Sequence, residues 1–137
     1  MKVHLSRRYG FSASHRLHSP ELSEEENRRV YGKCNNPYGH GHNYRLTVTL
    51  AGEPEAKTGM ICDLAAVDAA VNRLILQHFD HANLNSLPEF VKLVPTTENL
   101  AAVADSILRR ELSLPHLVSI RLDETNHNSV EYAGGAQ

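Results

Sequence analysis

Apolar residues recur with two different periods along the chain, and these periods predict its secondary structure. Alternation with a period of two, which is typical of half-buried strands, predicts strands at 2–17, 42–50 and 117–124, with a short last strand at 129–132. Between the second and third strands, two segments carry apolar residues at helical spacing. The first helix is expected to begin at the N-cap Asp63. The second follows Pro95, is capped by Thr96 or Thr97, and should end before Pro115.

The expected order of elements is therefore ββααββ. An antiparallel four-stranded sheet with both helices on one face is an α+β architecture. Its edge strands stay exposed unless they pair with another subunit, so we expect oligomerisation through the sheet. The polar segment 19–36, which includes the acidic run 24–26, is expected to be a solvated loop or turn of helix without chemistry. No repeat, low-complexity segment or linker interrupts the sequence, and residues 1–137 are expected to form a single domain.

Composition and charge exclude several classes of function. A formal net charge of −2 provides no electrostatic footprint for nucleic acid or an anionic membrane. No apolar run approaches the length of a membrane span, and the polar, basic segment 1–9 does not predict a signal peptide. Cys34 and Cys62 are too few for a disulfide framework. We therefore expect a reduced, cytoplasmic protein that binds neither nucleic acid nor membrane.

Histidine is the unusual feature of the composition. The chain has nine, and two of them, His40 and His42, lie two residues apart at a strand start and therefore on one face of that strand. A catalytic zinc site uses three protein ligands and keeps a fourth position open. His15 is the expected third ligand, because pairing of the first two strands as a hairpin brings it beside the other two. Any one of these histidines alone is more simply interpreted as an ordinary surface or core residue, but the pair between glycines favours a metal.

Cys34 lies six residues before His40, in a loop rich in Gly, Asn and Pro. A thiol near a cation has its thiolate form favoured, which suits a proton-abstracting base or a nucleophile. A fourth zinc ligand and an inert loop residue remain as alternatives for Cys34.

Three acidic residues and one histidine are further candidates. Asp80 can orient His81 as a general acid or base if the loop between them bends, although a polar helix end explains the pair equally well. Glu124 closes an otherwise apolar strand face, where a ligand with paired N–H donors would satisfy it. The simpler alternative for Glu124 is an ordinary residue at the rim of the fold. The simpler alternative for Glu98 is a first-turn acid that interacts with the helix dipole.

Taken together, these segments resemble the 6-pyruvoyl-tetrahydropterin synthase family, which also includes 6-carboxy-tetrahydropterin synthase. The similarity runs in unbroken order from about Phe11 to Tyr132. Its motifs lie at 11–19, 22–27, 32–44, 58–60, 80–84, 95–99 and 124–125. Two departures, Tyr38 for a usual Asn and Phe79 for a usual Leu, affect no proposed ligand.

The resemblance implies the tunnelling fold, in which subunits pair their strands into a trimeric barrel and two trimers stack into a homohexamer. It implies Zn²⁺ on His15, His40 and His42. It also implies that Cys34 is the catalytic thiol, with Asp80 and His81 as relay partners across a subunit boundary. The pterin ring of the substrate would be anchored by Glu124, assisted by Thr96, Thr97 and Glu98.

The reaction implied by the resemblance converts 7,8-dihydroneopterin triphosphate to 6-pyruvoyl-tetrahydropterin with loss of triphosphate, as in tetrahydrobiopterin-type biosynthesis. The nearest alternative is 6-carboxy-5,6,7,8-tetrahydropterin synthase of queuosine biosynthesis. The five residues between Cys34 and His40, together with segment 22–27, favour the pyruvoyl branch. A non-catalytic zinc- or pterin-binding protein is a third possibility, but metal binding alone would not need Cys34, Asp80, His81 and Glu124.

Overall fold

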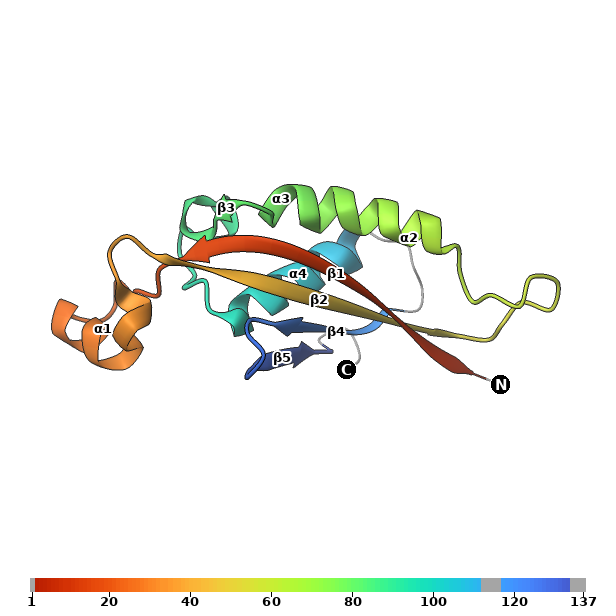
Figure 1. Ribbon diagram of the computed structural model, residues 1–137, viewed down its shortest axis with the longest axis horizontal. Coiled ribbons are helices and arrows are strands. Elements are labelled where there is room, and N and C mark those ends of the chain that lie inside the picture. The colour runs from red at the N-terminus through yellow and green to blue at the C-terminus, as the bar shows by residue number, and fades with distance from the viewer. Residues whose placement is uncertain (1, 112–116, 134–137) are drawn as a thin grey trace.

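A long β-hairpin forms the centre of the structure, a computed structural model that describes residues 2–111 and 117–133 (Figure 1). β1 (Val3–His15) pairs antiparallel with β2 (His40–Gly52) along its full length. β4 (Leu117–Asp123) pairs with the other edge of β2, and β5 (Ser129–Tyr132) pairs with β4. These four strands are the four that the sequence predicts, although β1 ends two residues earlier and β2 is longer at both ends.

One face of this sheet is covered by helices and the other is not. In β2, Tyr44, Leu46 and Val48 are buried, while Arg45 and Thr47 point to the opposite face. This alternation follows from the two-residue period of a strand. The buried core comes from the strands and from the helices that cover them: Phe11, Tyr44, Leu46, Val48, Leu50, Val67, Val71, Ile75, Phe79, Leu100, Leu108, Ile120 and Leu122.

Two helical segments provide the covering layer. α2 (Leu64–Val71) continues through a π-helical turn (Asn72–Leu76) into α3 (Gln77–Phe79), and α4 (Thr97–Glu111) follows later in the chain. The side chain of Asp63 accepts hydrogen bonds from the backbone of the first turn of α2, which confirms the predicted N-cap. α4 begins directly after Thr96, also as predicted, whereas Pro115 lies outside the described residues.

The sheet has a fifth strand that the sequence analysis missed, so the expected antiparallel four-stranded sheet is wrong in strand count and direction. β3 (Ala82–Asn83) pairs parallel with β1 and gives the order β3-β1-β2-β4-β5. A two-residue strand is too short to carry a periodic signal. Its pairing depends on β1, where the backbone oxygen of Ser12 accepts a hydrogen bond from the His81 N–H.

A third helix, α1 (Glu24–Tyr31), stands at the same end of the hairpin as His15 and His40 (Figure 1). Ser23 and Glu26 form a capping box, in which each side chain accepts a hydrogen bond from the other residue's backbone N–H. The acidic run 24–26 occupies the first turn, where negative charge is favourable to the helix dipole. The expected count of two helices is therefore wrong, although the acidic run does form a turn of helix. Within the ranges that the structure describes, no helix is long and apolar enough to cross a membrane.

Replacing Leu46 with Ala should destabilise the protein, because Leu46 is 0% exposed at the centre of the core. We expect a loss of about 2–5 kcal/mol in the free energy of unfolding. Chemical denaturation measures this loss, with Thr47→Ala on the uncovered face of the same strand as the control, for which we expect less than about 1 kcal/mol. Equal losses in the two variants would contradict the assignment of the faces.

Candidate active site

The end of the β1–β2 hairpin brings three histidines together. His15 lies directly opposite His40 in the strand register, and His42 is two residues further along β2, on the same face. Their ring centroids are 4.7–5.0 Å apart, and one nitrogen of each ring lies within 4.8 Å of the others. The predicted juxtaposition of His15, His40 and His42 is therefore present in the structure.

The ring of His15 is oriented by the backbone. Its Nδ1 lies 2.8 Å from the carbonyl oxygen of Pro95. A carbonyl oxygen can only accept a hydrogen bond, so Nδ1 carries the proton and Nε2 keeps its lone pair. That Nε2 faces His40 Nε2 at 3.2 Å. Histidines that bind metals through one ring nitrogen typically donate the other N–H to a carbonyl or carboxylate in this way.

The environment of the cluster fits a zinc ion. Nε2 of His42 is buried and has no hydrogen-bond partner among the described residues. A buried polar atom without a partner is costly, and a metal ion would satisfy it. Burial lowers the pKa of both His15 and His42, and the neighbouring imidazoles lower it further, which favours the neutral rings that metals bind. Three imidazole nitrogens are a donor set that zinc commonly takes in catalytic sites.

Glu124 lies beside this cluster, just beyond the end of β4. One carboxylate oxygen is 3.9 Å from His42 Nε2, and the other accepts a short hydrogen bond from the hydroxyl of Thr97. Asn128 also approaches the first oxygen, at 3.5 Å. Burial raises the pKa of Glu124, but the Thr97 hydrogen bond and the nearby His42 outweigh burial, and the net shift is downward. Glu124 is therefore held as a half-buried carboxylate.

Thr96, Thr97 and Glu98 have three different positions at the start of α4. Thr97 is buried and contacts Glu124 directly. Thr96 caps the helix, since its side-chain oxygen accepts a hydrogen bond from the Asn99 N–H. Glu98 is exposed in the first turn. Thr97 is therefore part of the site, and Thr96 has a structural role as a helix cap. Glu98 makes no contact with the described site residues.

Cys34 occupies a short 3₁₀ turn (Gly32–Asn35) between α1 and β2. Its thiol is free and half-buried, and its backbone oxygen accepts a hydrogen bond from the Leu17 N–H, which fixes the turn beside the end of β1. Burial raises the pKa of Cys34, and the charge of Glu124 raises it further. The protein groups alone therefore favour the thiol, and the thiolate expected from the sequence requires a nearby positive charge.

Asp80 and His81 form a contact pair at the outer edge of β1. Asp80 Oδ1 lies 3.1 Å from His81 Nδ1 and accepts a hydrogen bond from the Ser12 N–H at 2.8 Å. His81 has φ 61°, in the left-handed region that residues other than glycine rarely adopt, so the chain bends at this pair. The Ser12 hydrogen bond lowers the pKa of Asp80, against a smaller effect of burial, and His81 adds to the lowering. Asp80 is therefore placed to orient His81.

A shallow surface pocket of about 280 Å³ lies between His81 of this pair and His42 of the metal cluster. His81 and His42 both line it, together with Ser12 and Asn43. Within residues 2–111 and 117–133, however, no hydrogen bond or ion pair joins Asp80 or His81 to the three histidines, Cys34 or Glu124. The imidazole of His81 is largely exposed and available to another molecule.

Two groups that shape the site were not predicted from the sequence. The carbonyl of Pro95 orients His15, and the hydroxyl of Tyr44 lies 3.4 Å from the same ring nitrogen. Backbone carbonyl directions have no sequence signature. Tyr44 could have been noticed, because it stands two residues after His42 on the same strand face.

Comparison with known proteins gives one consistent family. The sequence model of the 6-pyruvoyl tetrahydropterin synthase family matches residues 4–135. The human protein called 6-pyruvoyl tetrahydrobiopterin synthase is 45% identical over 134 residues, which cover 97% of this chain and 92% of the human one. A Synechocystis protein called 6-carboxy-5,6,7,8-tetrahydropterin synthase is 30% identical over 128 residues, covering 90% and 88%.

A solved structure agrees with these sequence matches. The Caenorhabditis elegans 6-pyruvoyl tetrahydropterin synthase superposes with a TM-score of 0.94 at 40% identity, and the match covers 98% of this chain and 96% of that one. The resemblance seen in the sequence motifs is thereby confirmed in both sequence and fold. This chain belongs to the 6-pyruvoyl tetrahydropterin synthase family.

Proposed function

We propose that the protein is a zinc-dependent lyase that converts 7,8-dihydroneopterin triphosphate to 6-pyruvoyl-tetrahydropterin with loss of triphosphate. The observation that carries this proposal is the convergence of His15, His40 and His42 beside the carboxylate of Glu124. The similarity to proteins named as this synthase supports the same reaction. Two free cysteine thiols fit a reducing, cytoplasmic location.

The three histidines would hold the zinc ion through one ring nitrogen each. When bound, zinc supplies Lewis acidity, which polarises hydroxyl oxygens and makes neighbouring C–H protons more acidic. The Pro95 carbonyl keeps His15 in the tautomer that exposes Nε2. Holding this tautomer before substrate arrives avoids reorganisation during the reaction.

Glu124 would anchor the pterin ring. Its two oxygens can accept hydrogen bonds from the exocyclic amino group and the adjacent ring N–H, a bidentate arrangement that fixes orientation as well as affinity. Thr97 holds one of these oxygens in place, and the downward pKa shift keeps the carboxylate ionised. We assign the helix cap Thr96 a positioning role and keep Glu98 as a more distant contributor on the family resemblance.

Cys34 would act as the base that removes a carbon-bound proton from the substrate side chain. His81, oriented by Asp80, would exchange protons with the side-chain hydroxyl oxygens as the side chain tautomerises. Triphosphate leaves by elimination, and the electrons that reduce the ring come from the substrate side chain. No nicotinamide is therefore required by this stoichiometry.

The position of Asp80 and His81 leads to a proposal about assembly. The pair makes no bond to the metal cluster of its own chain within the described residues, and His81 is exposed. We propose that it serves the site of a neighbouring subunit in a homohexamer of two strand-paired trimers. Among the described strands, the outer edge of β5 and the part of the β1 edge before its two-residue pairing with β3 are unpaired, which is compatible with such pairing.

The 6-carboxy branch of the family is the second candidate function. Both branches would use the same metal site, so the geometry of the histidines does not separate them. The higher identity to the human pyruvoyl enzyme, 45% against 30% for the Synechocystis carboxy enzyme, favours the first branch. Segment 22–27, which motivated the same choice from the sequence, forms the capping box and first turns of α1.

The dependence on zinc tests the proposal. We expect the stripped protein to release no triphosphate from 7,8-dihydroneopterin triphosphate, and release to return in proportion to added zinc up to one ion per chain. The measurement is triphosphate release alongside metal content. Full release by the stripped protein would contradict the proposed role of the cluster.

Replacing Glu124 with Gln should weaken substrate binding, because an amide offers one acceptor instead of two and carries no charge. We expect KM to rise roughly tenfold or more, since a hydrogen bond to a charged group contributes about 1.5–3 kcal/mol. Steady-state kinetics measures the effect, with Glu25→Gln on the exposed face of α1 as the matched control. A KM equal to that of the control would remove Glu124 from the substrate site.

A further inference from the structure

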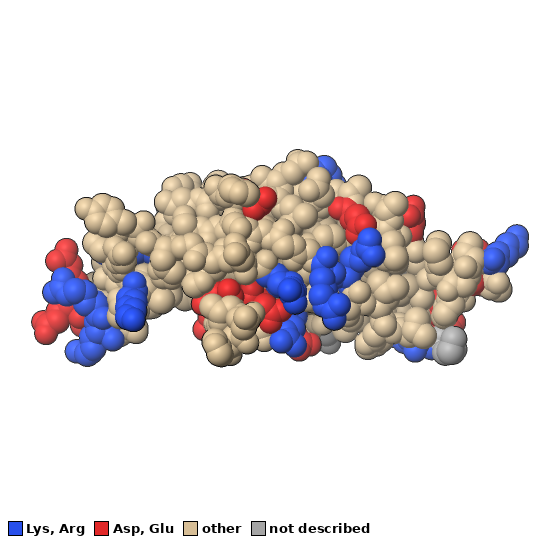
Figure 2. Space-filling view, viewed as in Figure 1, with Lys and Arg blue, Asp and Glu red and all other residues tan. Residues whose placement is uncertain are grey.

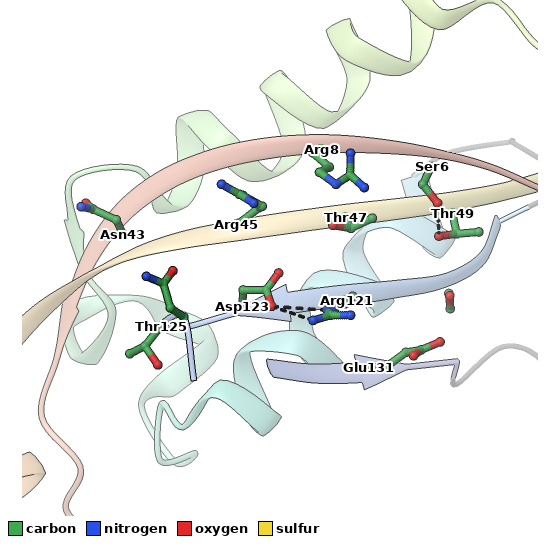
Figure 3. Close-up of a pocket in the computed structure, with 12 residues that line it drawn as sticks. Ser6, Arg8, Asn43, Arg45, Thr47, Thr49, Arg121, Asp123, Thr125 and Glu131 are labelled. Carbon is green, nitrogen blue, oxygen red and sulfur yellow. Dashed lines mark hydrogen bonds and ion pairs between the residues drawn. The ribbon is translucent and has the colours of Figure 1, made fainter. Parts of the chain in front are cut away.

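Three arginines lie together on the face of the sheet that no helix covers. Arg8 in β1 and Arg121 in β4 are both directly opposite Thr47 in β2, so the three share a face. Arg45 is two residues from Thr47 on β2 and therefore shares that face too. Figure 2 shows basic side chains gathered at the middle of this face, and Figure 3 shows the three arginines on adjacent strands.

These arginines line a hollow of about 600 Å³, which we call the arginine pocket. Its lining is almost entirely polar and includes Thr47, Asn43 and Asp123. Arg121 donates two hydrogen bonds to Asp123. In contrast, Arg8 and Arg45 make no side-chain hydrogen bond or ion pair with any residue that the structure describes. Two guanidinium groups in one hollow are thus left with their donors available.

The arginine pocket is separate from the histidine cluster. His40 and His42 occupy even positions of β2 and point toward the helices, whereas Arg45 and Thr47 occupy odd positions and point away from them. The same alternation separates His15 from Arg8 in β1. The sheet itself therefore lies between the two sites.

We propose that the arginine pocket binds an anion of linked phosphate groups, of the size of triphosphate. Guanidinium groups match phosphate oxygens with paired N–H donors, and they stay charged at any physiological pH. The arginines span three strands, a width of about 10 Å between the outer two, which suits a chain of phosphates better than a single ion. Asp123 lies directly opposite Arg45, and Glu131 lies directly opposite Arg121, in the strand register. These two carboxylates among the arginines would repel a broad acidic surface, so a compact ligand is favoured.

Calorimetric titration of the intact protein with inorganic triphosphate, in about 0.15 M salt, tests this proposal. We expect one site per chain, a dissociation constant raised at least tenfold in the double variant R8Q/R45Q, and much weaker binding of inorganic phosphate. Arg29→Gln, an exposed arginine of α1 outside the pocket, is the matched control. Parallel titration with ATP separates a site for free triphosphate from one for nucleotides, and measurable binding of either fits the linked-phosphate assignment.

Two further variants keep the test independent of folding and of the histidine cluster. Glu131→Gln removes a carboxylate from the pocket and should tighten triphosphate binding several-fold, a gain that misfolding cannot imitate. His42→Ala should leave triphosphate binding unchanged. Binding that survives R8Q/R45Q, or that is lost in His42→Ala instead, would overturn the proposal.

Discussion

Replacing His42 with Ala should abolish both zinc binding and turnover. The side chain supplies one of three converging ring nitrogens, and its Nε2 is buried with no partner in the described part of the chain. Loss of a group that only hydrogen-bonds to a metal ligand typically costs about 10–100-fold in metal affinity, so the loss of a ligand itself should cost more than about 100-fold. Zinc content after dialysis and the rate of triphosphate release measure the two effects.

His4→Ala is the matched control for this variant. His4 is an exposed histidine of β1 near the opposite end of the hairpin, where it faces Ala51. The control should keep one zinc ion per chain and full turnover. If His42→Ala retained zinc with unchanged affinity, the three histidines would not be the metal site.

Replacing Cys34 with Ala should lower kcat by about 10²–10⁴-fold, the usual contribution of a positioned acid or base. Zinc content should stay at the wild-type level, because the three histidines do not depend on the thiol. The thiol is half-buried, and the charge of Glu124 contributes to the upward shift of its pKa, after burial. Single-turnover kinetics with parallel metal analysis measures both quantities.

Cys62→Ala is the control for the thiol. Cys62 is also free and half-buried, and burial also raises its pKa, but it lies directly before the N-cap of α2. Its replacement should leave kcat unchanged. A Cys34→Ala enzyme with normal kcat would remove the thiol from the mechanism, and a loss of zinc in that variant would make Cys34 a fourth ligand instead.

The parts of the site that could be predicted from sequence are those that follow from strand geometry. His40 and His42 share a face because they are two residues apart, and pairing of the first two strands places His15 opposite His40. Glu124 continues the buried row of β4 for the same reason, and it meets the cluster through His42. In each case the two-residue period of a strand and one correct strand pairing were sufficient to predict which side chains meet.

The missed features depend on contacts that leave no local pattern. β3 exists because a two-residue segment pairs with β1, and the expected four-stranded sheet failed at that point. The Pro95 carbonyl orients His15 from 80 residues away in the chain. The expected thiolate at Cys34 presupposed a cation, whereas the protein groups around it raise the pKa of the thiol. Long-range polar contacts of these kinds are decided by tertiary packing.

Asp80 and His81 were predicted from their adjacency in the chain and not from strand geometry. Adjacency and an Asn-rich context allowed their contact as one of two equal alternatives, and in the structure the two side chains do meet, with a positive φ at His81. Within residues 2–111 and 117–133, the two side chains bond only to each other and to the Ser12 N–H, and neither bonds to the histidine cluster. In the proposed assembly, they act at the active site of a neighbouring subunit.

Identification of the reaction product tests the central claim most directly. Zinc-loaded protein is incubated with 7,8-dihydroneopterin triphosphate, and the products are separated and identified by mass. The proposed function predicts 6-pyruvoyl-tetrahydropterin and one equivalent of triphosphate. Formation of 6-carboxy-tetrahydropterin with acetaldehyde would move the protein to the other branch of its family, and no turnover with zinc bound would contradict the lyase assignment altogether.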